Sequence, residues 1–281
     1  MAGIIWLASF PKSGNTWMRI FLVNLFKGEQ APADINSLPN FTYGDMRGEY
    51  YRAILGKPNA EMTDEDLDSA RPKVHRMISQ RSPDPIFVKT HSALTILGGV
   101  PTITPEVTLA AIHIVRNPLD VTISYSHHYG LSISDTVDAL ASHANVIMGN
   151  DKMVPQLLGS WSDHTRSWTT ANGLQTLTLR YEDMLAKPLK EFGKVRDFLQ
   201  LPKDIKRLKR AVKNSAFDTV QKLEAKSGFI EQSKNNDTFF RKGQSGEWRE
   251  VLTDEQVAKT IETHREMMER FGYLDASGKP I

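Results

Sequence analysis

The sequence predicts an α/β protein in which a central parallel β-sheet is flanked by helices. Its 281 residues are enough to bury a full core within one domain. Several short apolar runs are rich in β-branched and aromatic residues, which is typical of strands buried on both faces of a parallel sheet. Stretches of helical character separate these runs, and such alternation indicates an α/β fold.

Four apolar runs predict the strands. The first comprises residues 4–10 and is bounded by Pro11. The others comprise residues 85–89, 109–115 and 174–179. Each is short and continuous rather than alternating with polar residues, so we expect these strands to lie inside the sheet with both faces covered.

The clearest helix boundaries lie after the third run. Asn117 precedes Pro118, which is the favoured order of an N-cap and a first-turn proline, and Gly130 supplies a stop signal. We therefore expect a helix over residues 118–129. A helix is also expected from about Thr16 to Gly28.

Two further helices are expected in the second half of the chain. One covers residues 188–199. In residues 203–213, apolar side chains at helical spacing separate the basic ones. This pattern predicts an amphipathic helix with a solvated basic face, and it explains the charge better than a nucleic-acid site does.

Two segments lack such periodicity. Residues 29–84 contain several prolines and aromatics, and residues 221–240 are polar. We expect these to be the mobile loops. No repeat or long linker divides the chain, so a single domain over residues 1–281 is expected.

The composition excludes several classes of protein. With 35 Lys and Arg against 33 Asp and Glu, the net charge of +2 is too near balance for a nucleic-acid coat. The absence of cysteine excludes disulfides, thiolate nucleophiles and cysteine-ligated metals. No apolar run approaches the ~20 residues of a membrane span, and residues 1–10 lack the features of a secretory signal. We expect a cytoplasmic protein with no membrane or nucleic-acid partner.

Residues 11–17, Pro-Lys-Ser-Gly-Asn-Thr-Trp, join the first strand to the first helix. A glycine lets the backbone approach a ligand, the helix N-terminus faces negative oxygens, and a lysine adds a full charge. The segment therefore predicts a site for phosphate or a similar oxyanion. A nucleoside-triphosphate loop would need a glycine where Ser9 stands and a lysine after the glycine, whereas Lys12 precedes Gly14. An ordinary ATP site is disfavoured.

Two more segments carry cations suited to phosphate. Arg116 follows the third strand, at the sheet edge where open α/β folds bind ligands, and can bind phosphate in bidentate fashion. Ser124 lies about two turns into the next helix. Residues 241–248, Arg-Lys-Gly-Gln-Ser-Gly-Glu-Trp, place two cations beside two glycines, as in a backbone that closes over an anion.

Together these segments resemble the cytosolic-type sulfotransferases, which use 3′-phosphoadenosine 5′-phosphosulfate (PAPS) as donor. Residues 11–17 are similar to the family's 5′-phosphosulfate loop, residues 116–125 to its 3′-phosphate segment, and residues 241–248 to its closing motif. Glu247 replaces the usual aspartate of that motif. The resemblance implies the P-loop-kinase-like sulfotransferase fold, a single sulfotransferase domain over residues 1–281, and PAPS as a co-substrate that leaves as 3′,5′-diphosphoadenosine (PAP).

The resemblance also implies which residues bind the donor. The 5′-phosphosulfate would contact the loop, in which Asn15 stands where many relatives carry threonine. The 3′-phosphate would contact residues of the other two motifs, and aromatic and polar side chains would enclose the adenine. The residues so implied are Lys12, Ser13, Gly14, Asn15, Thr16 and Trp17 in the loop; Arg116, Ser124, Arg241, Lys242 and Gly243 at the 3′-phosphate; and, with Trp17, Tyr181, Ser215 and Phe217 at the nucleoside.

Sulfuryl transfer to a hydroxyl or amine needs a base for the acceptor's proton and cations for the developing charge. His91 follows the second strand in a Lys-Thr-His segment similar to the family's, and a histidine is largely neutral at pH 7, so it is the candidate base. By resemblance, Lys12 would act on the bridging oxygen and Lys89 on the sulfuryl oxygens, while Ser124 would hold Lys12 until the acceptor arrives. No metal is implied.

Two other functions stay open at this point. A P-loop-type small-molecule or nucleotide kinase shares the strand, loop and helix, but the order of Lys12 and Gly14 speaks against it. A non-catalytic module that binds an adenine nucleotide would not need both Lys12 and His91. We expect a small-molecule acceptor; its identity and the oligomeric state are not evident from the residues.

Overall fold

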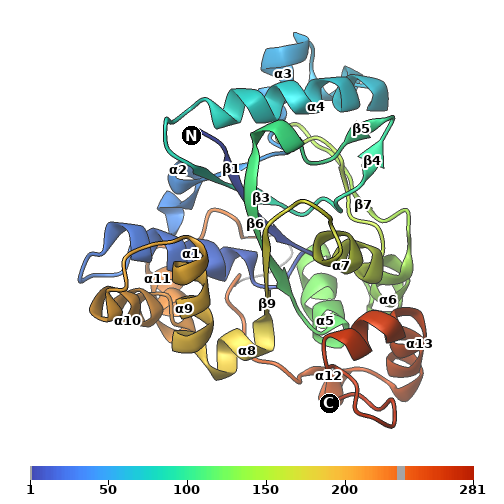
Figure 1. Cartoon of the computed structure of the whole chain (residues 1–281). Helices are drawn as coiled ribbons and strands as arrows, with labels where there is room; N and C mark the ends of the chain where they lie inside the picture. Colours follow the sequence, from blue (N-terminus) through green and yellow to red (C-terminus); the bar gives the residue numbers. More distant parts are fainter. Residues whose placement is uncertain (1, 233–237) are drawn as a thin grey trace. The chain divides into compact units, whose positions relative to one another are not determined.

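A computed structural model describes residues 2–232 and 238–281 of the chain (Figure 1). The chain forms two compact units, each described by itself below. The first comprises Met1–Phe10, Thr42–His113 and Ser142–Thr178, and the second comprises Pro11–Phe41, Ile114–Ala141 and Leu179–Ile281.

One five-stranded sheet has the strand order β2-β3-β1-β6-β9. β1 and β2 both run parallel to β3. The α/β class and the four expected strands are confirmed, whereas β2 has no apolar run that would have predicted it. The strands of this sheet are β1 (Ile4–Ser9), β2 (Thr42–Gly44), β3 (Ile86–Thr90), β6 (Thr108–Val115) and β9 (Thr176–Arg180).

The core of the first unit is built on β1 and β3. Trp6 and Val88 lie opposite each other in the register of this pair, and both are fully buried. The Trp6 indole N–H donates to the Thr108 hydroxyl at 2.9 Å, so its one polar atom is satisfied in the core.

Residues 29–84 contain helices, so the expectation of mobile loops is wrong for much of this segment. α3 (Gly48–Leu55) and α4 (Asp64–Ser79) run side by side in the first unit (Figure 1). α4 begins with a capping box and contains Pro72 in its interior. The helix persists because it buries an apolar face in the core, and this burial outweighs the hydrogen bond that proline cannot make.

Two hairpins and one helix complete the first unit. β4 (Ile96–Leu97) pairs antiparallel with β5 (Val100–Pro101), and β7 (Val146–Ile147) pairs antiparallel with β8 (Gln156–Leu157). α7 (Trp161–Thr169) packs against β1.

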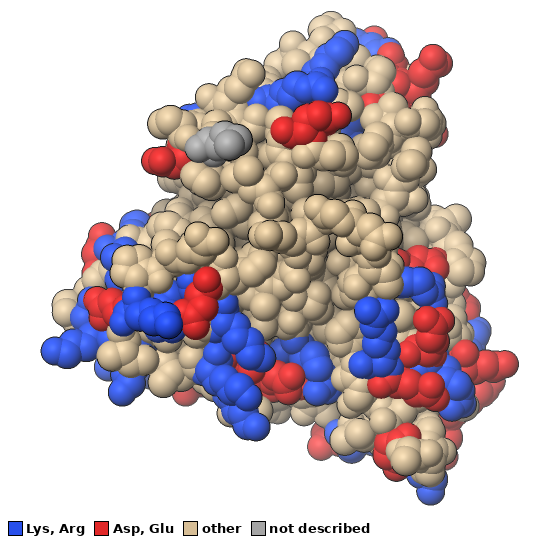
Figure 2. All heavy atoms as spheres, viewed as in Figure 1, with Lys and Arg blue, Asp and Glu red and all other residues tan. Residues whose placement is uncertain are grey.

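In the second unit, α1 (Asn15–Lys27) packs against α10 (Ile205–Asn214), which also packs against α9 (Pro188–Phe198). The Arg207 guanidinium donates to two carbonyls in the last turn of α1, each at 2.6 Å, and so satisfies the end of that helix. The expected amphipathic helix is confirmed, because Leu208 and Ala211 of α10 are buried whereas its lysines are exposed. Figure 2 shows charges of both signs interspersed over the region of α9 and α10 rather than a field of one sign.

α5 (Pro118–Tyr129) lies in the same unit, and its bounds match the expected helix. The Asn117 side chain caps it by accepting from the Leu119 N–H, and Gly130 ends it with a φ of 68°. Residues 233–237 of the second expected loop lie outside the described residues, and α11 covers the beginning of that loop. The other helices of the unit are α2 (Leu38–Phe41), α6 (Ile133–Ala141), α8 (Tyr181–Ala186), α11 (Phe217–Ser227), α12 (Trp248–Val251) and α13 (Asp254–Arg270).

Within the described ranges, no helix combines the length and the apolar character needed to cross a bilayer.

Candidate active site

The loop before α1 has the backbone of an anion-binding turn. Lys12 has a φ of 67° and Gly14 a φ of 109°, so two of its residues adopt left-handed conformations that L side chains rarely take. At Gly14 an added Cβ would lie 2.8 Å from the Tyr181 ring, so only glycine fits there. Ser13 is fully buried, and its hydroxyl finds no hydrogen-bond partner among the described residues. A buried hydroxyl of this kind suits a ligand oxygen.

Arg116 joins the three motifs within the second unit. Its guanidinium donates to the Lys12 carbonyl at 3.0 Å and to the Gln244 carbonyl at 3.1 Å. The same group lies over the Tyr181 ring, 4.4 Å from the ring centroid, in cation–π geometry. The expected 3′-phosphate arginine is therefore beside both the Pro11–Trp17 loop and the closing loop of residues 241–248.

Asp120 fixes the closing loop to the first turn of α5. This carboxylate is 2% exposed and accepts hydrogen bonds from the Ser245 hydroxyl at 3.0 Å, the Gly246 N–H at 2.8 Å and the Trp248 N–H at 3.3 Å. Sequence reasoning missed this role, although an acidic residue in the first turn of a helix after Arg-Asn-Pro was visible. Because its partners lie more than a hundred positions away, nothing local marked it.

Replacing Asp120 with alanine is expected to leave three donors without their acceptor and to lower the free energy of unfolding by about 1–3 kcal/mol. Chemical denaturation measures this loss, and hydrogen exchange at the Gly246 and Trp248 amides should accelerate. Asp64→Ala is the matched control because Asp64 is an exposed acid in the first turn of α4, a helix of the first unit. Unchanged exchange at both amides would show that Asp120 does not hold the loop.

The residues expected around the adenine also meet in the second unit. The Trp17 indole N–H donates to the Ser215 carbonyl at 2.8 Å, and its ring contacts that of Tyr181 edge to face. Gly243 has a φ of 59°, and a Cβ there would lie 2.1 Å from the Phe217 ring, so the closing loop packs directly on this aromatic side chain. The Ser215 hydroxyl is buried and donates to a carbonyl of α10. Its contact to a nucleotide stays a prediction.

The remaining loop residues have distinct surroundings. Asn15 and Thr16 are buried in the first turn of α1. The Lys12 ammonium lies 3.5 Å from His128 Nδ1 and 4.2 Å from the centroid of the Phe239 ring. Ser124 is half-buried on α5, one helical turn before His128. That Ser124 holds Lys12 therefore stays a prediction.

His91 lies in the first unit, and a hydrogen bond to the backbone selects one tautomer of its neutral imidazole. Its Nδ1–H donates to the carbonyl of Ser9, the last residue of β1, at 2.7 Å, which leaves the lone pair on Nε2. The backbone on either side is held as well. In the amide orientation that satisfies both of its ends, Gln156 accepts from the N–H groups of His91 and Ser92 at 3.1 Å each. The Trp168 indole donates to the Ser92 carbonyl at 3.0 Å. An oriented imidazole of this kind suits a general base.

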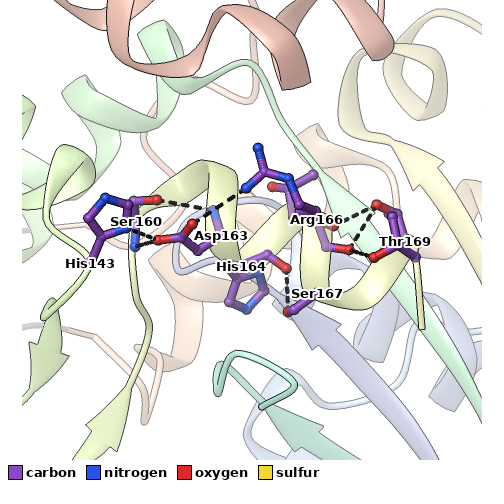
Figure 3. A network of polar contacts seen from close by, with 9 residues as sticks. His143, Ser160, Asp163, His164, Arg166, Ser167 and Thr169 are labelled. Atoms are coloured by element: carbon purple, nitrogen blue, oxygen red, sulfur yellow. Dashed lines mark hydrogen bonds and ion pairs between the residues drawn. The ribbon is translucent and has the colours of Figure 1, made fainter. Parts of the chain in front are cut away.

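α7 carries a second histidine that does not suit this role. Figure 3 shows the ion pair of Asp163 and His143 at one end of α7. The His164 ring lies below the helix in the same view. The His164 ring is fully buried and packs edge to face on Phe10 at a centroid distance of 5.6 Å. Burial lowers the pKa of His164 to about 3, so this imidazole is a weak proton acceptor compared with an ordinary histidine. His164 contributes packing rather than base catalysis.

A buried carboxylate lies under the Lys-Thr-His segment. The Thr90 hydroxyl donates to Asp45 at 2.7 Å, and Asp45 is 2% exposed. Burial raises the pKa of Asp45 from 3.8 to about 6, and the hydrogen bond from Thr90 and the charge of Lys89 only partly oppose this effect. Asp45 therefore ionises in the folded protein only near neutral pH.

Asp45 makes stability depend on pH with a defined sign. Because its folded pKa lies above its unfolded value, its favourable contribution is complete below pH 3.8 and is lost as pH rises to about 6. The loss amounts to about 3 kcal/mol. We expect Asp45→Asn, which can still accept from Thr90, to lack this decline in denaturant titrations between pH 4 and pH 7. Asp84→Asn, at an exposed site in the same unit, should follow the wild type. Parallel curves for Asp45→Asn and wild type would contradict the assignment.

The chain is similar to known proteins over most of its length. The chain is 24% identical over 268 residues to cytosolic sulfotransferase 1 of Danio rerio, covering 94% of this chain and 82% of that protein. Its fold is similar to that of mouse sulfotransferase SULT7A1 complexed with PAP, with a TM-score of 0.61 at 21% identity over 95% of this chain and 84% of that one. It is also similar to retinol dehydratase in a complex with retinol and PAP, with a TM-score of 0.65 at 19% identity over 95% and 81%. A family model described as the sulfotransferase domain matches residues 3–272, from β1 to the end of α13, and the chain therefore belongs to the sulfotransferase family.

Proposed function

We propose that this sulfotransferase moves the sulfuryl group of PAPS to a hydroxyl or amine of a small-molecule acceptor by in-line displacement. The observation that carries the proposal is the position of Arg116, which hydrogen-bonds both the Lys12 loop and the closing loop. These segments are the ones expected to bind the two charged ends of PAPS. Their contact within one compact unit matches the needs of a doubly anionic adenosine derivative.

The residues of the second unit fit the donor at both ends. The buried Ser13 hydroxyl and the N-terminus of α1 would hold the 5′-phosphosulfate. Arg116, Arg241 and Lys242 would hold the 3′-phosphate, with Ser124 and Gly243 as further contacts. The rings of Trp17, Tyr181 and Phe217 would contact the adenine, because they surround the same two loops.

We assign chemical roles to three side chains, those of His91, Lys12 and Lys89. PAPS, when bound, supplies the sulfuryl group and the leaving phosphate. His91 Nε2 takes the acceptor's proton, since Nδ1 is committed to the Ser9 carbonyl. The Lys12 ammonium stabilises charge on the bridging oxygen, and Lys89 stabilises charge on the sulfuryl oxygens. Positioning and electrostatic stabilisation thus account for most of the expected rate.

The proposal also covers the class of acceptor, the cellular location and the extent of the catalytic domain. Retinol dehydratase was solved with a small molecule, retinol, and the Danio rerio relative is named a cytosolic enzyme. By analogy we propose a small-molecule acceptor, a cytoplasmic location and one catalytic domain over residues 1–281. Family membership does not favour the kinase or the non-catalytic module.

Two measurements test this function. Calorimetry with the purified chain should show binding of PAP and none of ATP. Incubation with labelled PAPS and a panel of phenols, alcohols and amines should transfer the label to at least one class. Binding of ATP as tight as that of PAP, or an absence of PAP binding, would overturn the proposal.

A further inference from the structure

Glu247 pairs with both cations of the closing loop. Its carboxylate contacts the Arg241 guanidinium through two hydrogen bonds, one of them at 2.8 Å, and the Lys242 ammonium at 2.8 Å. Burial works to raise the pKa of Glu247, but the hydrogen bonds from Arg241 and Lys242 outweigh it and lower the pKa to about 2. Glu247 is therefore ionised at neutral pH and neutralises part of the charge of this loop.

The geometry of this pair is the one an arginine uses for phosphate. A guanidinium presents two parallel N–H groups, and a carboxylate and a phosphate both accept them in bidentate fashion. The N–H groups that Glu247 occupies on Arg241 are thus among those that a 3′-phosphate needs. An internal carboxylate and a ligand phosphate cannot both take the same donors.

We propose that Glu247 is an internal competitor for the 3′-phosphate and so determines how tightly this enzyme holds PAPS and PAP. This inference rests on the proposed function, because it assumes that Arg241 and Lys242 bind the 3′-phosphate. Glu247 would then determine the affinity and specificity of the enzyme for its donor. The family motif has aspartate at this position.

The backbone on both sides of Glu247 is anchored, which lets the carboxylate exchange partners without moving the loop. The N–H groups of Gly246 and Trp248 both donate to Asp120. The side chains of Arg241 and Lys242 are 34% and 44% exposed, so water screens the ion pairs and each is weak enough for a ligand phosphate to displace. Loss of the carboxylate should then increase affinity for the phosphate by a modest factor rather than by many orders of magnitude.

The alternative role for Glu247 is to orient Arg241 toward the phosphate, and it predicts the opposite change in PAP affinity. In that case removal of the carboxylate should weaken PAP binding. If Glu247 competes with the phosphate, removal should strengthen it. The sign of the change in affinity separates the two roles.

The test compares PAP with adenosine 5′-phosphate, which lacks the 3′-phosphate, by calorimetry and stopped-flow dissociation at constant pH and salt. We expect Glu247→Gln to bind PAP about tenfold tighter, a gain of about 1.4 kcal/mol, and to release it more slowly, with adenosine 5′-phosphate unchanged. Glu247→Asp, whose arm is one methylene shorter, should fall between the two. Glu250→Gln, at an exposed acid on α12, is the matched control and should bind both ligands as the wild type does.

The affinity of Glu247→Gln for the two ligands decides whether Glu247 competes with the 3′-phosphate. PAP binding by Glu247→Gln that equals or falls below the wild-type value overturns the inference, and so does an equal gain for both ligands. If Glu247→Gln melts at a much lower temperature, Glu247→Asp gives the answer, and unchanged PAP affinity in that variant then overturns it. A wild-type enzyme that fails to bind PAP refutes the proposed function itself, which is a separate result.

Discussion

Replacing His91 with alanine is expected to lower turnover by at least about a hundredfold while the protein remains folded. The imidazole is held by the Ser9 carbonyl in the tautomer that offers Nε2 to a proton, and alanine removes both that nitrogen and the hydrogen bond. The loss should appear in kcat with labelled PAPS and saturating acceptor. PAP binding should stay within a few-fold of the wild-type value, because we assign the donor to residues of the second unit.

The control for this experiment is His143→Ala. His143 is also in the first unit, but its side chain is 85% exposed and pairs with Asp163 at one end of α7. It should retain nearly full turnover. His164 is no substitute base because burial lowers its pKa to about 3. Near-normal activity of purified His91→Ala would therefore remove the base assignment.

The parts of the fold that were predictable are those that local residues determine. α5 begins and ends where expected because Asn117, Pro118 and Gly130 act within the helix and its caps. The buried strands were recognisable because each is a continuous apolar run. The extent of α4 was missed because Pro72 is a local signal against a helix, whereas the burial that stabilises α4 depends on residues distant in sequence.

In the candidate site, too, the roles that depend on neighbouring residues were predictable and those that depend on distant residues were not. The order of Lys12 and Gly14 is a local feature, and the residues alone therefore distinguish this loop from an ATP loop. Asp120 and Gln156 were missed because each acts on a segment far along the chain. Asp120 accepts from Gly246 across 126 positions, and Gln156 contacts Ser92 across 64. Polar residues that brace a distant loop carry no local pattern, so their roles emerge only from the folded chain.

Replacing Lys12 with methionine is expected to lower kcat by at least about a hundredfold, because the residue's charge would no longer stabilise the leaving oxygen. In the structure the Lys12 ammonium lies near the Phe239 ring and His128, at 4.2 Å and 3.5 Å. A cation–π contact of this kind is worth only about 0.5–2 kcal/mol, so the ammonium can leave it for a more strongly charged partner at little cost.

Methionine is preferable to alanine for this test because it keeps a long apolar stem against Phe239 while removing the charge. The left-handed backbone at Lys12, with a φ of 67°, is equally unfavourable for both residues, so a change in loop conformation does not explain a difference between Lys12→Met and the wild type. Lys27→Met, in the last turn of α1, removes one positive charge from the helix that follows the loop and should leave kcat unchanged. If Lys12→Met retained wild-type kcat, or lost activity only through weaker donor binding, Lys12 would serve to hold the phosphosulfate rather than to stabilise its departure.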